Sequence, residues 1–384
     1  MTSTNLSQVS GCFVGRVWEP SIGPILVTLR QGKIVDITSR ELITMCEVLE
    51  ADDPSSFVNN AKGRTICSLK ELEKESLEAD SDPSKLHFLA PNDLQSVKAA
   101  GVTFAKSMVE RVIEERAGGD PNAAAQIRAR IGSLIGESLS NIIPGSKQSQ
   151  RVKDALLREG LWSQYLEVGI GPDAEIFSKA QILSTVGWGA SVGLHPGSVW
   201  NNPEPEIVLA VNSKGLTVGA AIGNDVNLRD FEGRSALLLS KAKDNNASAS
   251  IGPFIRLFDK SYNMDDVRLA RLSMTITGND GYVLNGHSSM CEISRDPLDI
   301  VNQTINENHQ YPDGLMLYLG TLFAPTADRD IIGEGFTHKI GDRVEIEASG
   351  LGNLSNKVRL SKNCKPWVFG ASAFMKNLAK RGLL

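Results

Sequence analysis

The pattern of apolar and polar positions predicts short strands near the start of the chain. Apolar runs occupy Phe13–Val17, Ile25–Leu29 and Ile34–Ile37, and a turn at Gln31–Gly32 separates the second run from the third. We therefore expect this segment to be extended. The polar residues 48–85 that follow carry no pattern to which a function can be attached.

Helical periodicity follows over Asn92–Arg116, where apolar residues fall near one stripe. Asn92 or Asp93 can cap the start of this helix. A second helix is predicted from Asp120, because this residue can act as the cap with Pro121 at the first helical position.

The character of the chain changes near residue 165. The loop-like stretch "PGSKQSQ" occupies residues 144–150, and from Gly169 onward short apolar runs are broken by glycines. A length of 384 residues agrees with two domains. We place them at residues 1–165, an N-terminal α+β domain, and at residues 166–384, a catalytic domain.

Composition and charge exclude several classes of protein. With a net charge of −5 the chain offers no basic surface for nucleic acid. Since no apolar run approaches the roughly 20 residues that span a bilayer, no membrane partner is expected either. The stretch "MTSTNLSQVSG" lacks the pattern of a signal peptide. The five cysteines are scattered without a C-x-x-C pair, which favours free thiols in a reducing compartment. We expect a cytoplasmic protein.

Three carboxylates flank a predicted hairpin, "NNPEPEIVLAVNSKGLTVGAAIGNDVNLRD", at residues 201–230. Side chains two positions apart on a strand share a face, so Glu204 and Glu206 project together. If the turn centres on Ser213–Gly215, facing residues have numbers that sum to about 429, by the symmetry of a tight hairpin. Asp225 then lies opposite Glu204, within a residue or two.

Such a cluster indicates a divalent metal. Three like charges raise one another's pKa unless a cation neutralises them. Hard oxygen ligands select Mg²⁺, Mn²⁺ or Ca²⁺. The spacing alone leaves an alternative open, because charged residues also occur at solvated sheet edges.

Other ionisable residues are less specific by pattern. Glu175 and Lys179 lie in "GPDAEIFSKAQILS", and Lys243 lies in "LLLSKAKDNN" after a predicted helix. Taken alone, Glu175 and Lys179 are typical of a charged surface. Lys243 is typical of a lysine near a helix C-terminus, where the helix dipole favours a positive charge. A lone histidine such as His195 is usually structural, and Arg229 can form a local ion pair with its neighbour.

Taken in order, the motifs resemble the fumarylacetoacetate hydrolase family. They are "AEIFSKAQILS", "NNPEPEIVLAV", "GNDVNLRDFEG", "SKAKDNNASASIGPFI", "YLGTLFAP" and "GFTHKIGDRVEIEASGLGNLSNKV", between Gly169 and Leu360. The resemblance implies an α+β fold, with a small N-terminal domain followed by a mixed β-sandwich roll that carries the catalytic site. It also implies Glu204, Glu206 and Asp225 as metal ligands, and a homodimer or homotetramer.

Further motifs, "GRVWEPSIGP", "LAPNDLQSVKAAGVTFAKSMVERVIEERAGGDP" and "VGLHPGSVWNNPEPE", resemble the 2-keto-3-deoxy-D-xylonate (2-keto-3-deoxy-D-arabinonate) dehydratase branch of that family. This resemblance implies Mg²⁺-dependent dehydration of a small-molecule 2-keto acid, 2-keto-3-deoxy-D-pentonate, to 2-oxoglutarate semialdehyde. It implies Glu175 and Lys243 as acid–base groups, the lysine with a pKa lowered by burial and by the metal. Candidates for holding the substrate are Lys179, Ser198, Arg229 and Thr321, although Arg229 could instead brace Asp225.

Two other functions are compatible with a metal hairpin. A hydrolase that cleaves a 2,4-diketo acid needs a histidine paired with a carboxylate to activate water. The segment before the glutamates offers Glu175 and no histidine before His195, which speaks against this reaction. The other alternative is a non-catalytic protein that binds a metal and a keto acid.

Overall fold

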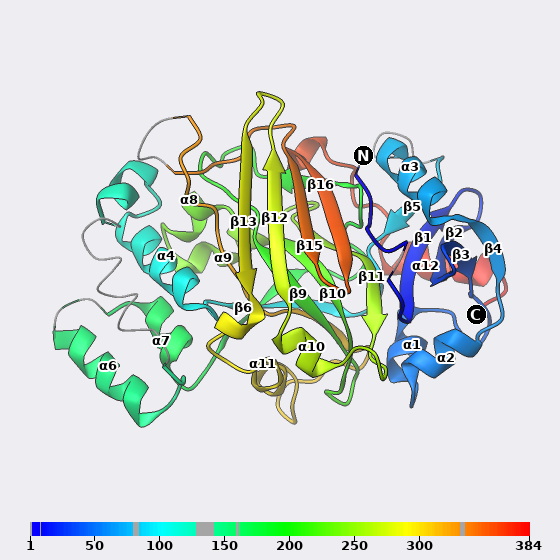
Figure 1. Cartoon of the computed structure of the whole chain (residues 1–384), viewed down its shortest axis with the longest axis horizontal. Coiled ribbons are helices and arrows are strands. Elements are labelled where there is room, and N and C mark those ends of the chain that lie inside the picture. The colour runs from blue at the N-terminus through cyan, green and yellow to red at the C-terminus, as the bar shows by residue number, and fades with distance from the viewer. Residues whose placement is uncertain are drawn as a thin grey trace.

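Two β-sheets packed face to face form the centre of the molecule (Figure 1). The computed structural model describes residues 2–7, 9–79, 84–127, 142–158, 160, 162–330 and 335–384. The smaller sheet lies over the middle of the larger one, where β15 and β16 contact β10 and β11. The fold is α+β, as the sequence predicted.

The larger sheet contains eleven strands and runs in the order β4-β3-β2-β1-β11-β10-β9-β14-β6-β7, with β5 paired to β1. Strands from both sides of residue 165 share this sheet, and the division of the chain at that residue stays a prediction. The strands are β1 (Phe13–Glu19), β2 (Gly23–Arg30), β3 (Lys33–Asp36), β4 (Arg64–Ser68), β5 (His87–Leu89), β6 (Ser96–Gly101), β7 (Glu175–Ala180), β9 (Pro205–Val211), β10 (Thr217–Asp225), β11 (Ala249–Leu257) and β14 (Leu315–Tyr318).

The smaller sheet has five strands in the order β13-β12-β15-β16-β8. Side chains of β12 and β15 alternate between buried and more exposed positions, because one face packs on the larger sheet and the other faces outward. The strands are β8 (Ser191–Leu194), β12 (Arg271–Thr277), β13 (Val283–Ser289), β15 (Arg343–Ala348) and β16 (Gly352–Leu360).

The helices gather in groups around the sheets (Figure 1). Beside the β1–β4 end lie α1 (Met45–Glu50), α2 (Pro54–Asn60), α3 (Leu69–Ala79) and α12 (Ala371–Lys380). At the opposite side lie α4 (Ala105–Arg116), α6 (Lys147–Arg158), α7 (Gln164–Ile170), α8 (Arg229–Glu232) and α9 (Leu239–Lys243). The short helices α10 (Met264–Arg268) and α11 (Pro297–Thr304) lie near one end of the strands of the smaller sheet.

The early strands were predicted correctly, and one predicted helix was wrong in its first half. β1, β2 and β3 cover the three apolar runs, and Gln31 and Gly32 turn between the last two with positive φ. Over Asn92–Arg116, however, the first part is strand β6, which pairs with β14 and β7. This tertiary pairing overrides the local helical pattern, so α4 begins only at Ala105.

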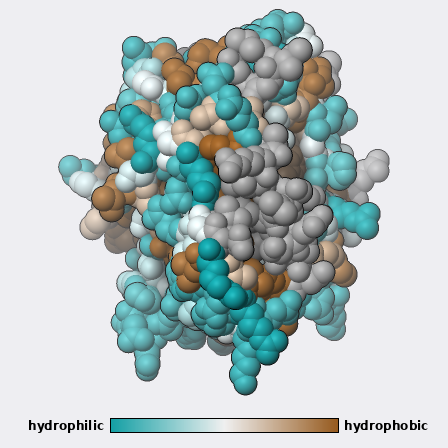
Figure 2. All heavy atoms as spheres, turned by 90° about the vertical axis from the view of Figure 1, so that its left-hand side faces the viewer, coloured by the Kyte–Doolittle hydropathy of each residue, from teal (hydrophilic) through white to brown (hydrophobic). Residues whose placement is uncertain are grey.

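The second predicted helix is observed over residues 121–127, and the rest of that prediction falls outside the described residues. Figure 2 shows the side of the molecule that carries these helices, where hydrophilic and hydrophobic residues are interspersed. Among the residues that the structure describes, no helix is both long and apolar enough to cross a membrane.

Candidate metal centre

The β9–β10 hairpin has the register that the sequence predicted. Glu206 pairs with Gly223 and Pro205 with Asn224, and the N–H of Asp225 donates to the carbonyl of Glu204 at 3.0 Å. The turn is closed by the side chain of Asn212, whose Oδ1 accepts two backbone N–H groups at 3.0 Å. Both strands are almost entirely buried, so their register cannot slip without exposing the core.

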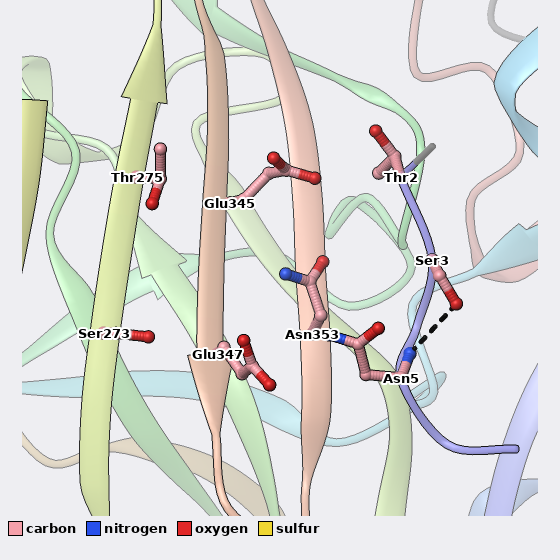
Figure 3. Close-up of a pocket in the computed structure, with 8 residues that line it drawn as sticks. All are labelled: Thr2, Ser3, Asn5, Ser273, Thr275, Glu345, Glu347 and Asn353. Carbon is pink, nitrogen blue, oxygen red and sulfur yellow. Dashed lines mark hydrogen bonds between the residues drawn. The ribbon is translucent and has the colours of Figure 1, made fainter. Parts of the chain in front are cut away.

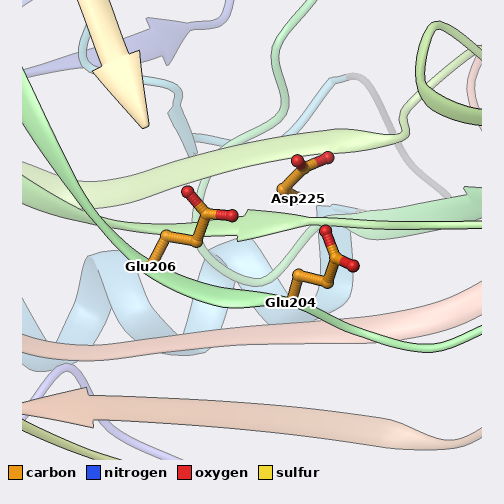
Figure 4. Close-up of side chains that lie close together, drawn as sticks. All are labelled: Glu204, Glu206 and Asp225. Atoms are coloured by element: carbon orange, nitrogen blue, oxygen red, sulfur yellow. The ribbon is translucent and has the colours of Figure 1, made fainter. Parts of the chain in front are cut away.

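This register brings three carboxylates together (Figure 4). Glu204, Glu206 and Asp225 each offer one oxygen such that the three atoms lie within 4.8 Å of one another. Each residue is only 1% exposed. Among the described residues no thiol or imidazole joins this cluster. Three carboxylates suit a hard dication such as Mg²⁺, and the donor set therefore fits this metal.

Two buried lysines also contact the cluster. Nζ of Lys243 contacts Oε2 of Glu204 and lies 3.0 Å from Oδ2 of Asp225. Nζ of Lys179 lies 2.8 Å from the other oxygen of Asp225 and donates to the carbonyls of Val226 and Lys243. Lys179 thus braces Asp225 and the backbone around it, and its predicted role in holding substrate stays a prediction.

A further buried cation at the cluster, Arg111 on α4, was not predicted from the sequence. Its guanidinium contacts Glu204, lies 2.6 Å from Glu114, and lies 3.0 Å from Glu232 on α8. Arg229 pairs with Glu114 at 3.2 Å and does not contact Asp225 within the described chain. The only local signal was the spacing of Arg111 and Glu114, three positions apart in a predicted helix, which ordinary surface helices share.

Because two of these cations contact Glu204 and not Glu206, the pKa values of the two glutamates shift in opposite directions. Burial opposes ionisation of Glu204, but Lys243 and Arg111 outweigh it and lower the pKa of this carboxyl to about 2. Glu206 has no such cation in contact, so burial and the charges of Asp225 and Glu204 raise its pKa well above the usual value. The N–H of Gly320 and the hydroxyl of Thr321 donate to Glu206 at 2.8 and 3.2 Å. A dication would supply the charge that Glu206 lacks.

Glu175 lies on β7, on the same strand face as Phe177 and Lys179. The ring of Phe177 lies 5.6 Å from Nζ of Lys243, which places this face toward the carboxylate cluster. Burial, reinforced by the charge of Glu232, raises the pKa of Glu175 to about 7. Its carboxyl has room only because the facing residue is Gly101, where a Cβ would lie 1.8 Å from Oε2 of Glu175.

The predicted lowering of the pKa of Lys243 by burial and a bound metal stays a prediction, and the carboxylates of the chain itself act in the other direction. Burial lowers the pKa of its ammonium, but Asp225 and Glu204 raise it further, and the net direction is upward. These neighbours favour the charged form as a proton donor or an electrostatic anchor. Glu175 is therefore the group whose pKa suits proton transfer near neutral pH.

The remaining candidates lie further from the three carboxylates. Ser198 donates to Asp230 at 2.7 Å, outside the cluster. His195 accepts from the N–H of Gly197 and packs edge-on against Phe231. In the part of the chain that the structure describes, no histidine bonds to Glu204, Glu206 or Asp225.

A polar hollow lies on the outer face of the smaller sheet (Figure 3). Glu345 and Glu347 of β15 line it, together with Asn353 of β16 and the N-terminal residues Ser3 and Asn5. None of the predicted site residues lines this hollow.

Residues 178–359, which include the whole hairpin, match the model of the fumarylacetoacetate (FAA) hydrolase C-terminal family. This match covers a little less than half of the chain. All three predicted metal ligands fall inside the matched segment, as do Lys179 and Lys243, whereas Glu175 precedes it by three residues.

Two curated relatives are similar to half of this chain. One, from Haloferax volcanii, is named probable 2-keto-3-deoxyxylonate dehydratase and is 30% identical over 194 residues, 50% of this chain and 63% of the relative. The other, 2-dehydro-3-deoxy-D-arabinonate dehydratase from Saccharolobus solfataricus, is 29% identical over 188 residues, 48% of this chain and 58% of the relative. The match thus spans about three fifths of each relative's length.

A solved structure extends the likeness to most of the fold. 2-Keto-3-deoxy-D-arabinonate dehydratase complexed with magnesium and 2,5-dioxopentanoate superposes with a TM-score of 0.63 and 21% sequence identity, covering 91% of this chain and 99% of the other. At this identity the likeness shows the fold alone.

Proposed function

We propose that this protein is a Mg²⁺-dependent dehydratase that converts a 2-keto-3-deoxy-D-pentonate to 2-oxoglutarate semialdehyde. The observation that carries the proposal is the buried cluster of Glu204, Glu206 and Asp225, with Lys243 in contact and the titratable Glu175 on β7. The names of the two curated relatives support the same reaction, as does the solved dehydratase with its magnesium and its dioxopentanoate.

Glu204, Glu206 and Asp225 would hold the metal. When bound, Mg²⁺ supplies a Lewis acid for the keto oxygen and the adjacent carboxylate of the substrate. Lys179 holds Asp225 in place, and Gly320 and Thr321 orient Glu206 by hydrogen bonds. Buried ligands whose oxygens are already bonded lose little freedom when a cation binds, which favours affinity.

The elimination step moves two protons and releases one water, and the isomerisation that follows moves two more, from C5 and its hydroxyl to C3 and C4. A base removes a proton from C3, the C4–O bond breaks, and an acid protonates the departing hydroxyl. The remaining unsaturated alcohol then isomerises to the aldehyde. Glu175, with a pKa of about 7, can take the first proton, and the ammonium of Lys243 can donate to the leaving hydroxyl. Ser198, Arg229, Thr321 and Lys179 remain candidates for substrate contacts.

The competing reaction, hydrolysis of a 2,4-diketo acid, has no comparable support. It would need a histidine–carboxylate pair at the cluster. The described pair of this kind, His338 and Asp342, is shared with the buried Arg329. This arginine holds Asp342 in a structural ion pair, and burial lowers the pKa of His338.

A coupled assay tests the proposal. Protein stripped with EDTA is incubated with 2-keto-3-deoxy-D-pentonate and Mg²⁺, and any semialdehyde is oxidised by an NAD(P)⁺-dependent dehydrogenase. Cofactor reduction that requires Mg²⁺, disappears in Glu204→Ala and persists in Glu345→Ala supports the dehydratase. Pyruvate released from a diketo acid, with no semialdehyde from the pentonate, would contradict it.

Two further parts of the proposal rest on the sequence, the assembly on the family resemblance and the location on the scattered cysteines. We propose that the protein is a homodimer or homotetramer and that it acts in the cytoplasm. Sedimentation equilibrium distinguishes these assemblies from a monomer, and cell fractionation tests the location.

A further inference from the structure

The two carboxylate oxygens of Glu204 contact different cations. Oε1 receives the guanidinium of Arg111, whereas Oε2 receives the ammonium of Lys243. Since Lys243 also contacts Asp225, it is Oε2 that faces the other carboxylates of the cluster. Oε1 of Glu204 is therefore ion-paired with Arg111, and Oε2 is the oxygen that points toward the metal position.

We infer that Arg111 is a positioning residue that keeps Glu204 a one-oxygen ligand and thereby favours Mg²⁺ over Ca²⁺. The inference rests on the proposed metal site. Mg²⁺ requires six oxygens in near-octahedral geometry, while Ca²⁺ accepts six to eight oxygens and readily takes a carboxylate through both. Because Oε1 is engaged by a buried cation, Glu204 cannot turn both oxygens to the metal without breaking that ion pair.

Arg111 is itself fixed from several sides. Its NH1 lies 2.6 Å from Glu114 on the next turn of α4 and 3.0 Å from Glu232 on α8. Glu114 is in turn paired with Arg229, whose guanidinium lies 5.4 Å from the ring of Trp200. A planar guanidinium can bridge these carboxylates through its fixed set of donors, which a single ammonium on a flexible stem cannot reproduce.

The chain of contacts also links the metal position to two helices. Arg111 joins α4 to the start of β9, and Glu232 joins α8 to the same guanidinium. Removal of Arg111 would leave three buried carboxylates without their shared partner, so the freed Glu204 could rotate toward an incoming cation. Loss of Arg111 should therefore increase the affinity for Ca²⁺, which can bind both oxygens of Glu204, more than the affinity for Mg²⁺, which binds one.

Titration calorimetry of the stripped protein with MgCl₂ and with CaCl₂ tests this inference. Changing partners of metal ligands typically alters affinity by about 10–100-fold. We expect the ratio of Kd for Ca²⁺ to Kd for Mg²⁺ to fall about tenfold in Arg111→Met and in Arg111→Lys. Arg111→Lys keeps a positive charge at this buried position and should therefore stay folded. The Tm of each variant checks that it is folded. Arg16→Met, a buried arginine paired with Asp93 instead, should keep the wild-type ratio.

The outcomes separate the inference from the proposed function. An unchanged ratio in a folded Arg111→Lys protein, with wild-type binding of Mg²⁺ intact, overturns the role of Arg111 and leaves the dehydratase proposal standing. A wild-type protein that binds neither cation overturns both. An equal change in Arg16→Met would also overturn the inference, because any buried arginine would then have the same effect.

Discussion

Nζ of Lys243 lies 3.0 Å from Oδ2 of Asp225 and also contacts Oε2 of Glu204, so one ammonium bridges two of the three clustered carboxylates. The lysine comes from the end of α9, where its backbone carbonyl is in turn bonded by Lys179. The position of this charge governs both the stability of the cluster and its response to a metal.

Replacement of Lys243 should make the protein depend on Mg²⁺ for stability. Loss of one partner of a buried ion pair costs about 3–5 kcal/mol, since the remaining charges stay buried. Lys243→Met should therefore melt at a lower temperature, and Mg²⁺ should raise its Tm by more than that of the wild type. Turnover should fall about 10²–10⁴-fold. Lys241→Met, an exposed neighbour, is the control; an equal Mg²⁺ response in both variants would contradict the bridging role.

The stability of the protein should fall as pH rises through the titration of Glu175. Its pKa is raised from 4.5 to about 7 in the folded state. Between these values the folded state holds a proton that the unfolded chain has lost, so the folded state is favoured at low pH and this advantage is lost toward pH 7. In Glu175→Gln the contribution disappears.

Melting curves of the two proteins across this window provide the measurement. The Tm of Glu175→Gln relative to the wild type should rise between pH 4.5 and about 7 and then stay constant. A difference that does not change with pH would mean that Glu175 titrates alike in the folded and unfolded states.

Gly101 should be essential for the position of Glu175. A Cβ at this residue would lie 1.8 Å from Oε2 of Glu175, so Gly101→Ala must displace the carboxyl. We expect kcat to fall about 10²-fold while Mg²⁺ affinity is kept, because the metal ligands do not touch Gly101. Gly370→Ala, where the nearest atom to a Cβ is 3.9 Å away, is the matched control. Normal turnover in Gly101→Ala would remove Glu175 from the mechanism.

Lys179 offers a test between bracing the metal site and holding substrate. It is fully buried and lies 2.8 Å from Asp225. If its role is to hold that ligand, Lys179→Met should weaken Mg²⁺ binding about 10–100-fold, with KM for the keto acid unchanged at saturating metal. Calorimetry and steady-state kinetics on the same preparation measure the two quantities. A raised KM with normal metal affinity would instead favour the substrate role predicted from the sequence.

The hairpin could be predicted from the sequence because its geometry is local. A short turn fixes the register of two adjacent strands, and buried strands cannot slip. The position of Asp225 opposite Glu204 therefore followed from the numbering of the turn, and the backbone hydrogen bond between them agrees with it.

Arg111 could not be found in the same way. It lies 93 residues before Glu204 in the chain, and its contact depends on the packing of α4 against the hairpin. In the same region the apolar pattern of residues 96–101 also suits a helix, and only pairing with β14 and β7 makes this segment a strand. Contacts of this kind depend on tertiary packing, which a local sequence pattern does not predict.

The central claim, that Glu204, Glu206 and Asp225 bind a divalent cation, is tested most directly by Mn²⁺ in crystals. Anomalous diffraction locates Mn²⁺ without reference to any reaction. We expect one strong peak among these three carboxylates, lost in crystals of Glu206→Gln and absent from the hollow beside Glu345 and Glu347. A wild-type crystal soaked with Mn²⁺ that shows no peak at the cluster would contradict it.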